Sequence, residues 1–382
     1  MNRVALILGQ DLGFCRGVLR GVQSFANRHE SWIFRDAAPV PEVIAPLREW
    51  NPAGIIAHLF DQSLADELLR LGKPVVNVTS TLAELKVPLV EVDHLAVGKM
   101  AARYFLDAGF RNFGYFGSRT AGFSHDRERG FCETVEAAGH RCLSCYAEYL
   151  PRPALGGSWL EIDEQVKGWL LSLPKPVAIF ASNDVPAREL AEVCRLLNLQ
   201  VPEEVALLGV DNDELECGLA YPPLSSIAIP SERVGFEAAA ILSQMMAGKP
   251  PPAQPLFLPP KAVVVRQSSD VVAVEDPDLS AVLRFIRQHA AEPITVETIL
   301  AHVPVSRRKL ERTFSRVMNR TILDEIRRVR IERVKRLLST TDLQMPAIAT
   351  QAGFESARRL ATVFRQMTGI TPTDYRNQFR RG

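Results

Sequence analysis

The chain has 382 residues, of which 47% are hydrophobic and 23% are charged, and its formal net charge at pH 7 is +1. This length suffices for two or three globular domains. No apolar run of about 18 residues is present, so a membrane span is excluded. The opening segment MNRVALILGQD has the pattern of a buried strand rather than of a signal peptide. We therefore expect a cytoplasmic protein.

Residues 1–265 alternate short apolar runs with helix-length segments. The expected strands are 4–9, 32–37, 53–59, 74–79, 89–93, 113–117, 177–182 and 205–211, and the expected helices are 15–28, 62–71, 95–108, 127–138, 161–172 and 186–198. Near-continuous apolar strands separated by helices predict parallel sheets covered on both faces. So many units favour an α/β domain with two lobes, about 1–110 with 228–255 and 111–227 with 256–265.

Polar side chains follow several of these strands, at the edge where open parallel sheets bind ligands. They are Asp11, His58, Asp93, Asn183, Asp184 and Asp211. A carboxylate beside a carboxamide suits a polyol, because carboxylate oxygens accept from hydroxyls while the amide donates. Phe14 is a candidate for covering the apolar face of a sugar. Each aspartate alone also fits a helix N-cap, but several such loops converging on one cleft favour a binding site.

Six cysteines are scattered at positions 15, 132, 142, 145, 194 and 217. Cys142 and Cys145 form a CxxC pair, but no second pair or histidine cluster completes a zinc site. We expect reduced structural thiols, no metal and no other cofactor.

Residues 266–278 are small, acidic and proline-containing, and we expect them to form a linker. Beyond it the charge balance changes. Residues 276–382 carry 20 Lys and Arg against 11 Asp and Glu, whereas the preceding residues carry 25 against 33. A basic segment of this kind favours contact with nucleic acid.

Residues 279–382 contain two similar helix-turn-helix patterns. The apolar stripes are Val296, Ile299, Leu300, Val303, Leu310, Phe314 and Val317 in the first, and Ile348, Ala349, Ala352, Leu360, Val363, Phe364 and Met367 in the second. Pro304 with Ser306, and Gly353 with Phe354, interrupt the two patterns. The run 322–338 predicts one helix joining them, so that one chain could contact two successive major-groove segments.

The second helix of each motif has a basic outward face, which suits phosphates and guanine edges. The candidate DNA-binding residues are Ser306, Arg307, Arg308, Glu311 and Arg312 in the first motif and Ser356, Arg358, Arg359, Thr362 and Arg365 in the second. Two roles remain open for Glu311, acceptance from a cytosine or pairing with a neighbouring arginine. Phosphate contacts are expected from Arg316, Arg320, Arg327 and Arg365.

The C-terminal region resembles the AraC family of transcription regulators. The resemblance rests on Ile348-Ala349, Gly353-Phe354, Ser356, Leu360, Phe364, Thr368-Gly369, Thr371-Pro372 and Tyr375-Arg376. It covers about 100 residues and implies a double helix-turn-helix DNA-binding domain at 279–382. Arg359 stands where relatives often have an aromatic or small polar residue, which affects individual base contacts rather than the fold.

The phrases DRERGF (126–131), SNDVPA (182–187) and GVDNDE (209–214) are similar to the effector-binding part of LacI-type repressors and periplasmic sugar-binding proteins. This resemblance implies a sugar-sensing domain at 1–265. It also implies sugar contacts from Arg127, from the pair Asn183 and Asp184, and from Asp211.

The combined order of the two modules resembles the family of xylose operon regulators. The resemblance implies a sugar-responsive transcription activator of pentose catabolic genes with D-xylose as effector. We also expect a homodimer formed through the sensor, repeated DNA half-sites and RNA polymerase as a further partner. The alternatives are a regulator for another sugar, a sugar-acting enzyme and a sugar carrier. The sequence contains no recognisable nucleophile constellation, which argues against a sugar-acting enzyme. A sugar carrier would leave the basic C-terminal region unexplained.

Overall fold

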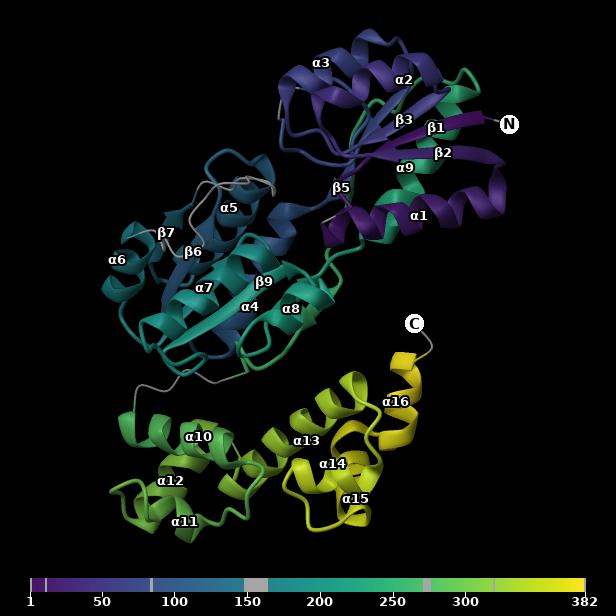
Figure 1. Ribbon diagram of the computed structural model, residues 1–382. Coiled ribbons are helices and arrows are strands. Elements are labelled where there is room, and N and C mark those ends of the chain that lie inside the picture. The colour runs from purple at the N-terminus through teal and green to yellow at the C-terminus, as the bar shows by residue number, and fades with distance from the viewer. Residues whose placement is uncertain are drawn as a thin grey trace. The chain divides into compact units, whose positions relative to one another are not determined.

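The computed structural model describes residues 2–10, 12–82, 85–147, 164–270, 276–318 and 320–380. It has two compact units, Met1–Val271 and Val272–Gly382, and each is considered by itself (Figure 1). The first unit is an α/β domain of two lobes and the second is all-helical, which confirms the predicted fold class. Within the described ranges, no helix has the length and apolar character needed to cross a bilayer.

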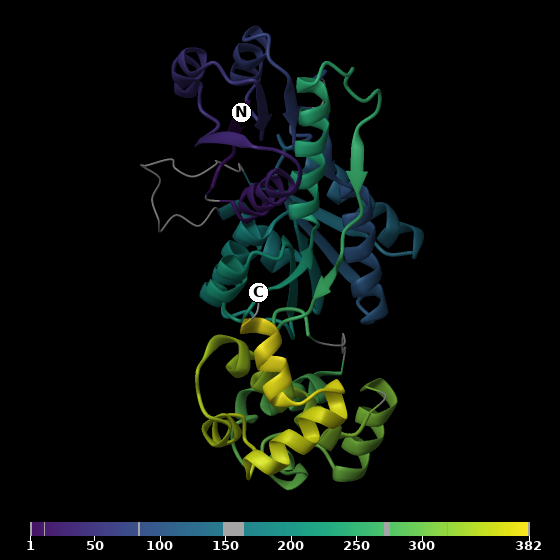
Figure 2. The ribbon, with the colours of Figure 1, turned by 90° about the vertical axis from the view of Figure 1, so that its right-hand side faces the viewer.

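The first lobe contains a parallel four-stranded sheet in the order β2-β1-β3-β4. Its elements are β1 (Asn2–Ile7), α1 (Gly13–His29), β2 (Trp32–Ala37), η1 (Pro41–Val43), α2 (Ile44–Trp50), β3 (Gly54–Ala57), α3 (Gln62–Arg70), β4 (Val75–Asn77) and α9 (Ser231–Met246). The helices α2 and α3 pack on one face of the sheet. The helix α9 runs beside α1 (Figures 1 and 2).

The second lobe contains a six-stranded sheet in the order β12-β10-β9-β8-β6-β7, and β12 is its antiparallel edge strand. Its elements are α4 (His94–Asp107), β6 (Asn112–Gly117), α5 (Gly122–Ala137), β7 (Cys142–Tyr146), α6 (Glu164–Ser172), β8 (Val177–Ala181), α7 (Asp184–Leu196), β9 (Val205–Asp211), α8 (Glu214–Leu219), β10 (Ser225–Ala228) and β12 (Ala262–Val264). The strands β7 and β10 were not among the expected strands.

Short segments connect the lobes, and β5 (Val90–Val92) pairs there in parallel with β11 (Leu256–Leu258). The helix α4, expected in the first lobe, packs against α5 of the second. Two glycines allow this approach: a Cβ added at Gly98 would overlap the backbone oxygen of Arg127, and one at Gly130 would overlap that of Leu95. The first lobe therefore ends before α4, earlier than the expected boundary near residue 110.

The first residues of the segment expected as a linker are packed into the first unit. Arg266 donates to the Leu224 carbonyl and to Asn212 Oδ1, each over 2.8–2.9 Å. Ser268 is fully buried, and its hydroxyl donates to the Leu207 carbonyl. Residues 266–269 therefore extend the first unit along the end of its second sheet.

The second unit has seven helices in its described part. They are α10 (Pro277–His289), α11 (Val296–Leu300), α12 (Arg307–Met318), α13 (Ile322–Thr340), α14 (Met345–Gln351), α15 (Ala357–Thr368) and α16 (Pro372–Arg380). Two hydrophobic cores lie beneath them, one around Phe314 and one around Phe364. Met367, expected on the apolar stripe of the last motif, is 45% exposed and is not part of the second core.

One pair of cysteines forms a disulfide, although all six were expected to be reduced thiols. Cys132 of α5 and Cys142 of β7 form a disulfide, and their Cα atoms are 5.4 Å apart. The pair arises because α5 lies over the sheet beside β7, a proximity that spacing along the chain does not reveal. Cys15, Cys145, Cys194 and Cys217 are buried and lie outside this disulfide.

Candidate functional site

A pocket lies between the two lobes, at the carboxyl ends of their strands. Its lining residues are Leu12, Gly13, Phe14, His58, Thr79, Glu91, His94, Phe123, Arg127, Asn183, Asp184, Val185, Asp211, Asp213 and Glu216. Both lobes contribute to it, because α1, β3 and β4 belong to the first and α5, α7 and β9 to the second. This is the topological position at which open parallel sheets bind ligands.

The structure brings together most of the residues expected to bind sugar. Phe14, His58, Arg127, Asn183, Asp184 and Asp211 all line the pocket. Asp93 does not. It is the N-cap of α4 and accepts a 2.9 Å hydrogen bond from the backbone N–H of Ala96. The N-cap interpretation is therefore correct for Asp93, and Asp11 lies outside the described residues.

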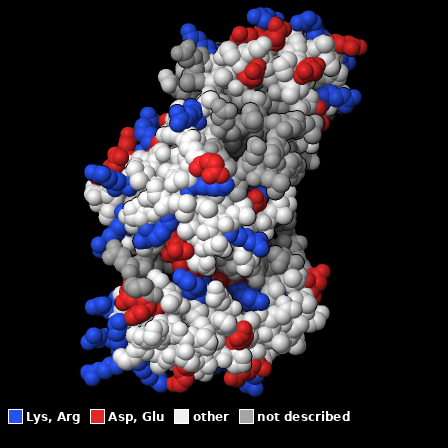
Figure 3. All heavy atoms as spheres, turned by 60° about the vertical axis from the view of Figure 1, so that its left-hand side comes forward, with Lys and Arg blue, Asp and Glu red and all other residues white. Residues whose placement is uncertain are grey.

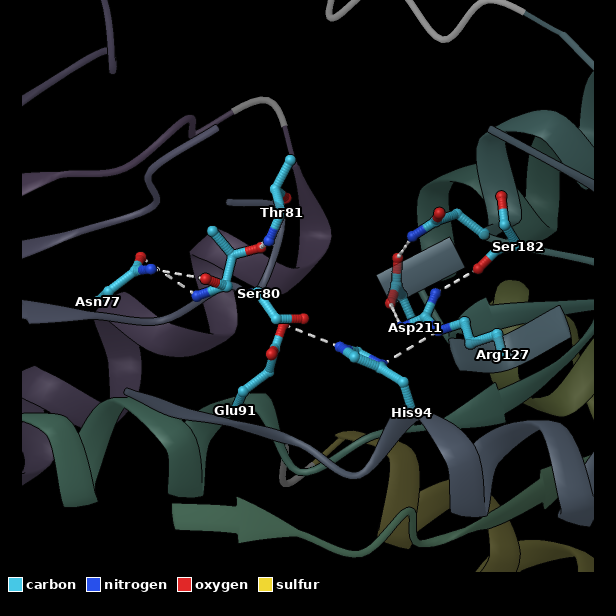
Figure 4. A network of polar contacts seen from close by, with 10 residues as sticks. Asn77, Ser80, Thr81, Glu91, His94, Arg127, Ser182 and Asp211 are labelled. Atoms are coloured by element: carbon cyan, nitrogen blue, oxygen red, sulfur yellow. Dashed lines mark hydrogen bonds and ion pairs between the residues drawn. The ribbon is translucent and has the colours of Figure 1, made fainter. Parts of the chain in front are cut away.

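Arg127 is the centre of a buried polar network (Figure 4). The residue is only 2% exposed. It donates to the Ser182 carbonyl and, through Nε, to His94 Nδ1 over 3.2 Å. Its Nη2 atom also lies 3.8 Å from Asp211 Oδ1. These partners fix the guanidinium in one orientation against the pocket, because its donors are directed to three different groups.

His94 lies between Arg127 and Glu91, as Figure 4 shows. Burial, reinforced by the Arg127 charge, lowers the pKa of His94, so the ring is neutral at pH 7. Since Arg127 can only donate, Nδ1 accepts, and Nε2 carries the proton that it shares with Glu91 Oε1 over 2.8 Å. The network thereby connects β5 at the lobe connection with α5 of the second lobe.

Glu91 is a pocket residue that the sequence analysis missed. It is 3% exposed, and its Oε1 atom accepts from the backbone N–H of Ser80 as well as from His94. Its Oε2 atom is buried and has no hydrogen-bond partner in the described structure. A buried carboxylate oxygen in this state is an acceptor available to a ligand hydroxyl. A signal existed: Glu91 is the one charged residue inside the apolar run LVEV.

Asp211 ends β9 with an unusual backbone. Its φ angle is 110° and that of Asn212 is 53°, both in the left-handed region that non-glycine residues seldom adopt. Hydrogen bonds from the Asn212 N–H to Ser226 Oγ and from Arg266 to the Asn212 side chain hold this turn. The turn presents the Asp211 carboxylate to Asn183 Nδ2, which donates to it over 2.9 Å. Strained backbone at a ligand cleft indicates a positioned functional group.

Two neighbouring carboxyls share this buried environment. Burial raises the pKa of Asp211, and the Arg127 charge opposes the rise. Burial, followed by the charge of Asp211, raises the pKa of Asp184 well above its ordinary value. Asp184 Oδ2 accepts from the Asp213 N–H over 2.8 Å. Asp184 therefore holds the loop before α8 in place, and it also lines the pocket.

The lobes also meet at the edge of the pocket. Arg16 of α1 forms an ion pair with Asp213, which follows β9, and the nitrogen and oxygen are 2.7 Å apart. The backbone of Gly13 lies against the same carboxylate, because a Cβ added there would be 2.7 Å from Asp213 Cγ. Gly122 of the second lobe also lies close to Ser80 of the first, because a Cβ added at Gly122 would overlap the Ser80 carbonyl oxygen. These contacts are made directly between the two lobes.

The chemistry of the pocket suits a hydroxyl-rich, uncharged ligand. Five carboxyl side chains line it, while Arg127 is the only arginine or lysine in its described lining. The donors of that arginine are already directed to Ser182, His94 and Asp211. Carboxylates accept from hydroxyls, whereas they would repel a ligand phosphate or carboxylate. Phe14 and Phe123 add apolar surface from opposite lobes.

The second unit presents both predicted recognition helices, α12 and α15, with polar outward faces. Arg308, Glu311, Arg312, Arg358, Arg359, Thr362 and Arg365 are all exposed. The opposite faces are buried at Leu310 and Phe314 in α12 and at Leu360 and Phe364 in α15. Figure 3 shows basic side chains gathered along one edge of this unit. The helices can therefore approach DNA without disturbing their cores.

Several of the predicted contacts have partners within the protein. Arg307 pairs with Glu297 over 2.6 Å and with Glu311 over 2.9 Å, which favours the pairing role for Glu311. Ser356 caps α15 by accepting from the Arg359 N–H over 3.2 Å. The exposed hydroxyl of Ser306 accepts similarly from the Lys309 N–H at the start of α12. Both serines thus have structural roles at helix N-termini.

Arg320 was expected to contact phosphate, but it pairs inside the unit. Its Nε atom lies 2.6 Å from Glu325 Oε2, and Arg328 approaches the same carboxylate at 2.7 Å. Glu325 is fully buried. A buried carboxylate requires compensating charge, so Arg320 has a structural role as a partner of Glu325 rather than the expected role of a phosphate contact.

Comparison with known proteins agrees with the division into an α/β first unit and a helical second unit. Residues 102–269 match the periplasmic binding protein-like domain model, and residues 299–378 match a helix-turn-helix domain model. The chain is 27% identical to the xylose operon regulatory protein of Escherichia coli (strain K12) over 384 residues, covering 98% of this chain and 97% of that protein. It is 29% identical to the Haemophilus influenzae protein of the same name, covering 85% and 84%.

A solved structure, described as that of the xylose-binding transcription activator xylR, superimposes with a TM-score of 0.80 at 26% identity, covering 99% of this chain and 98% of that one. The class of protein follows from the two domains and the full-length match. The chain is a DNA-binding transcription regulator in which a periplasmic-binding-protein-like sugar sensor precedes an AraC-type helix-turn-helix domain. Within that class its likeness, over the full length, is to proteins described as XylR, which are transcription regulators rather than sugar-acting enzymes.

Proposed function

We propose that the chain is a cytoplasmic, xylose-dependent activator of pentose catabolic genes. The observation that carries the proposal is the inter-lobe pocket, where Glu91, Arg127 and Asp211 converge in a full-length relative of proteins described as xylose regulators. The sensor is the first unit, which includes residues 266–269, and the DNA-binding domain is formed by the helices α10 to α16 of the second unit. A homodimer formed through the sensor binds repeated half-sites and acts on RNA polymerase.

In this proposal the sugar lies between Phe14 and Phe123, with hydroxyls directed to carboxylates of both lobes. Glu91 accepts from one side, and Asp211, held by Asn183, accepts from the other. His58 and Asp184 complete the walls. Binding favours the closed form by as much as the sugar binds it better than the open form.

The direct test is a thermal-shift titration of the full-length chain with xylose, arabinose, ribose and glucose. Xylose should raise the melting temperature at the lowest concentration, following RT ln(1 + [L]/Kd). Xylose should also change the affinity of the chain for DNA sites selected from a random duplex library. A chain that binds those sites but responds to no pentose would refute the effector, while leaving the DNA-binding role intact.

Glu91→Gln is expected to weaken xylose binding about 10- to 100-fold, because an amide nitrogen in place of Oε2 cannot accept from a hydroxyl. Calorimetric titration measures the change. The matched control is Asp93→Ser, two residues away, which keeps an N-cap side chain on α4 but removes the carboxylate. Its Kd should stay within about twofold of the parent value. An equal loss in both variants would remove Glu91 from the proposed site.

Arg358→Ala is expected to cost about 1–3 kcal/mol of DNA-binding free energy and to relax the preference at one base pair. Arg365→Ala should instead weaken binding to all sequences and lower the salt slope by about one unit. Fluorescence anisotropy on selected sites at several salt concentrations separates the two outcomes. Identical behaviour of the two variants would contradict the assigned roles.

A further inference from the structure

The second unit has two hydrophobic cores that share one helix. The first half of α13 contributes Ile322 and Ile326 to the core around Phe314. Its second half contributes Ile331, Val334, Leu337 and Leu338 to the core around Phe364. The change from one core to the other occurs across residues 327–330. Bending or twisting of α13 at this point would change the separation and the relative rotation of α12 and α15.

Arg330 lies at this changeover and contacts the end of α10 in the first half of the unit. Its Nε atom donates to the Ala290 carbonyl over 2.9 Å, and its Nη2 atom donates to the Glu292 carbonyl over 2.7 Å. Ala290 is the C-cap of α10 and is 2% exposed. The planar guanidinium can join two carbonyls in a fixed geometry, which an ammonium cannot reproduce.

Gly353, in the turn between α14 and α15, packs against Ala290 and Arg330 from the second half of the unit. A Cβ added there would overlap the Ala290 carbonyl and lie 2.9 Å from Arg330 Nε. The residue also has φ +79°, which favours glycine. The turn that precedes α15 is therefore packed directly onto Arg330 and the end of α10.

We propose that Arg330 is a positioning residue for DNA recognition, which holds α12 and α15 at one separation and rotation by joining α10, α13 and the turn at Gly353. Arg330 acts through the two recognition helices rather than through a base contact of its own. The consequence is that the protein accepts one spacing between its two DNA elements. This inference rests on the proposed contact of both helices with DNA.

The test compares spacing profiles of full-length variants. A binding site is selected from a random duplex library with the parent protein, and both contacted elements are located by footprinting. Duplexes with one to five base pairs inserted between the elements are then titrated by fluorescence anisotropy with the parent protein, Arg330→Ala, Arg330→Lys and Lys335→Ala. Lys335 is the matched control, because it lies on α13 and pairs with Glu332 of the same helix.

The parent protein and Lys335→Ala should lose about tenfold or more in affinity when the spacing changes, since the second helix then misses its groove. Arg330→Ala should bind the selected spacing about 10- to 100-fold more weakly. Its affinity should also vary by less than about threefold across the insertions. Arg330→Lys should have an affinity and a dependence on spacing between those of the parent protein and Arg330→Ala. Far-ultraviolet circular dichroism confirms that each variant is folded.

A uniform loss across all spacings with an unchanged profile would overturn the inference, because it would make Arg330 a residue of general stability only. The Arg330→Lys profile decides the same question if Arg330→Ala does not fold. A parent footprint restricted to one element would instead refute the proposed contact by both helices. The two failures are therefore distinguishable.

Discussion

Replacing Arg127 with methionine is expected to destabilise the first unit by about 3–5 kcal/mol and to abolish the response to sugar. The substitution keeps most of the volume but leaves Asp211 without its buried counter-charge and the Ser182 carbonyl without its donor. Urea denaturation followed by circular dichroism measures the loss. The control is Arg129→Met on the same helix, where the side chain is 57% exposed and pairs only with Asp126 among the ion pairs described. Its cost should not exceed about 1 kcal/mol.

The pH dependence of the Arg127→Met effect has a definite sign. Burial raises the pKa of Asp211, and Arg127 opposes that rise, so removing Arg127 raises the pKa further. A carboxyl with a higher pKa in the folded state than in the unfolded state loses stability as the pH rises between the two values. The variant should therefore be closer to the parent protein at pH 4.5 than at pH 8. A deficit that is larger at pH 4.5 would contradict the proposed buried charge balance.

Gly98→Ala is expected to destabilise the chain by about 1–3 kcal/mol and to weaken sugar binding at temperatures where the protein is folded. A methyl group at this position would overlap the Arg127 carbonyl and lie 2.7 Å from the Phe131 nitrogen. The helices α4 and α5 would have to separate, which would displace both His94 and Arg127. Thermal unfolding and calorimetric sugar titration measure the two effects.

Gly168→Ala is the matched control for Gly98→Ala. Gly168 also lies within a helix, α6, but a Cβ added there meets no described atom within 4 Å. Both substitutions gain helix propensity, worth up to about 1 kcal/mol, so the difference between them isolates the packing contact. A stabilised Gly98→Ala variant would show that the two helices can move apart without cost.

Much of the first unit could be predicted because its buried strands are apolar runs. VALI, GIIA and VAIFA each form a strand with little or no exposure. The strand β10 was missed because its sequence is SSIA, in which both serines are buried and hydrogen-bonded rather than apolar. The strand β7 was missed because it is a partly exposed edge strand with little apolar pattern. Tertiary position, rather than local propensity, determines both strands.

The candidate pocket was partly predictable for a different reason. The strand-end rule identified Phe14, His58 and Asp211, because a parallel sheet brings its carboxyl ends to one edge. The rule also selected Asp93 and passed over Glu91, since it cannot distinguish a helix cap from a residue inside a strand that faces the cleft. Arg127 came from the family resemblance alone. Partners such as His94 depend on how α4 packs against α5, which no short motif specifies.

The Arg16–Asp213 pair has a consequence for the duration of a transcriptional signal. Under the proposed function, a sugar enclosed between the lobes would leave only after the lobes open, and this ion pair would have to break first. The persistence of the response after the sugar is removed would then depend on how fast the lobes open. Arg16→Ala should therefore increase the rate at which the sugar dissociates from the protein. Stopped-flow measurements give this rate.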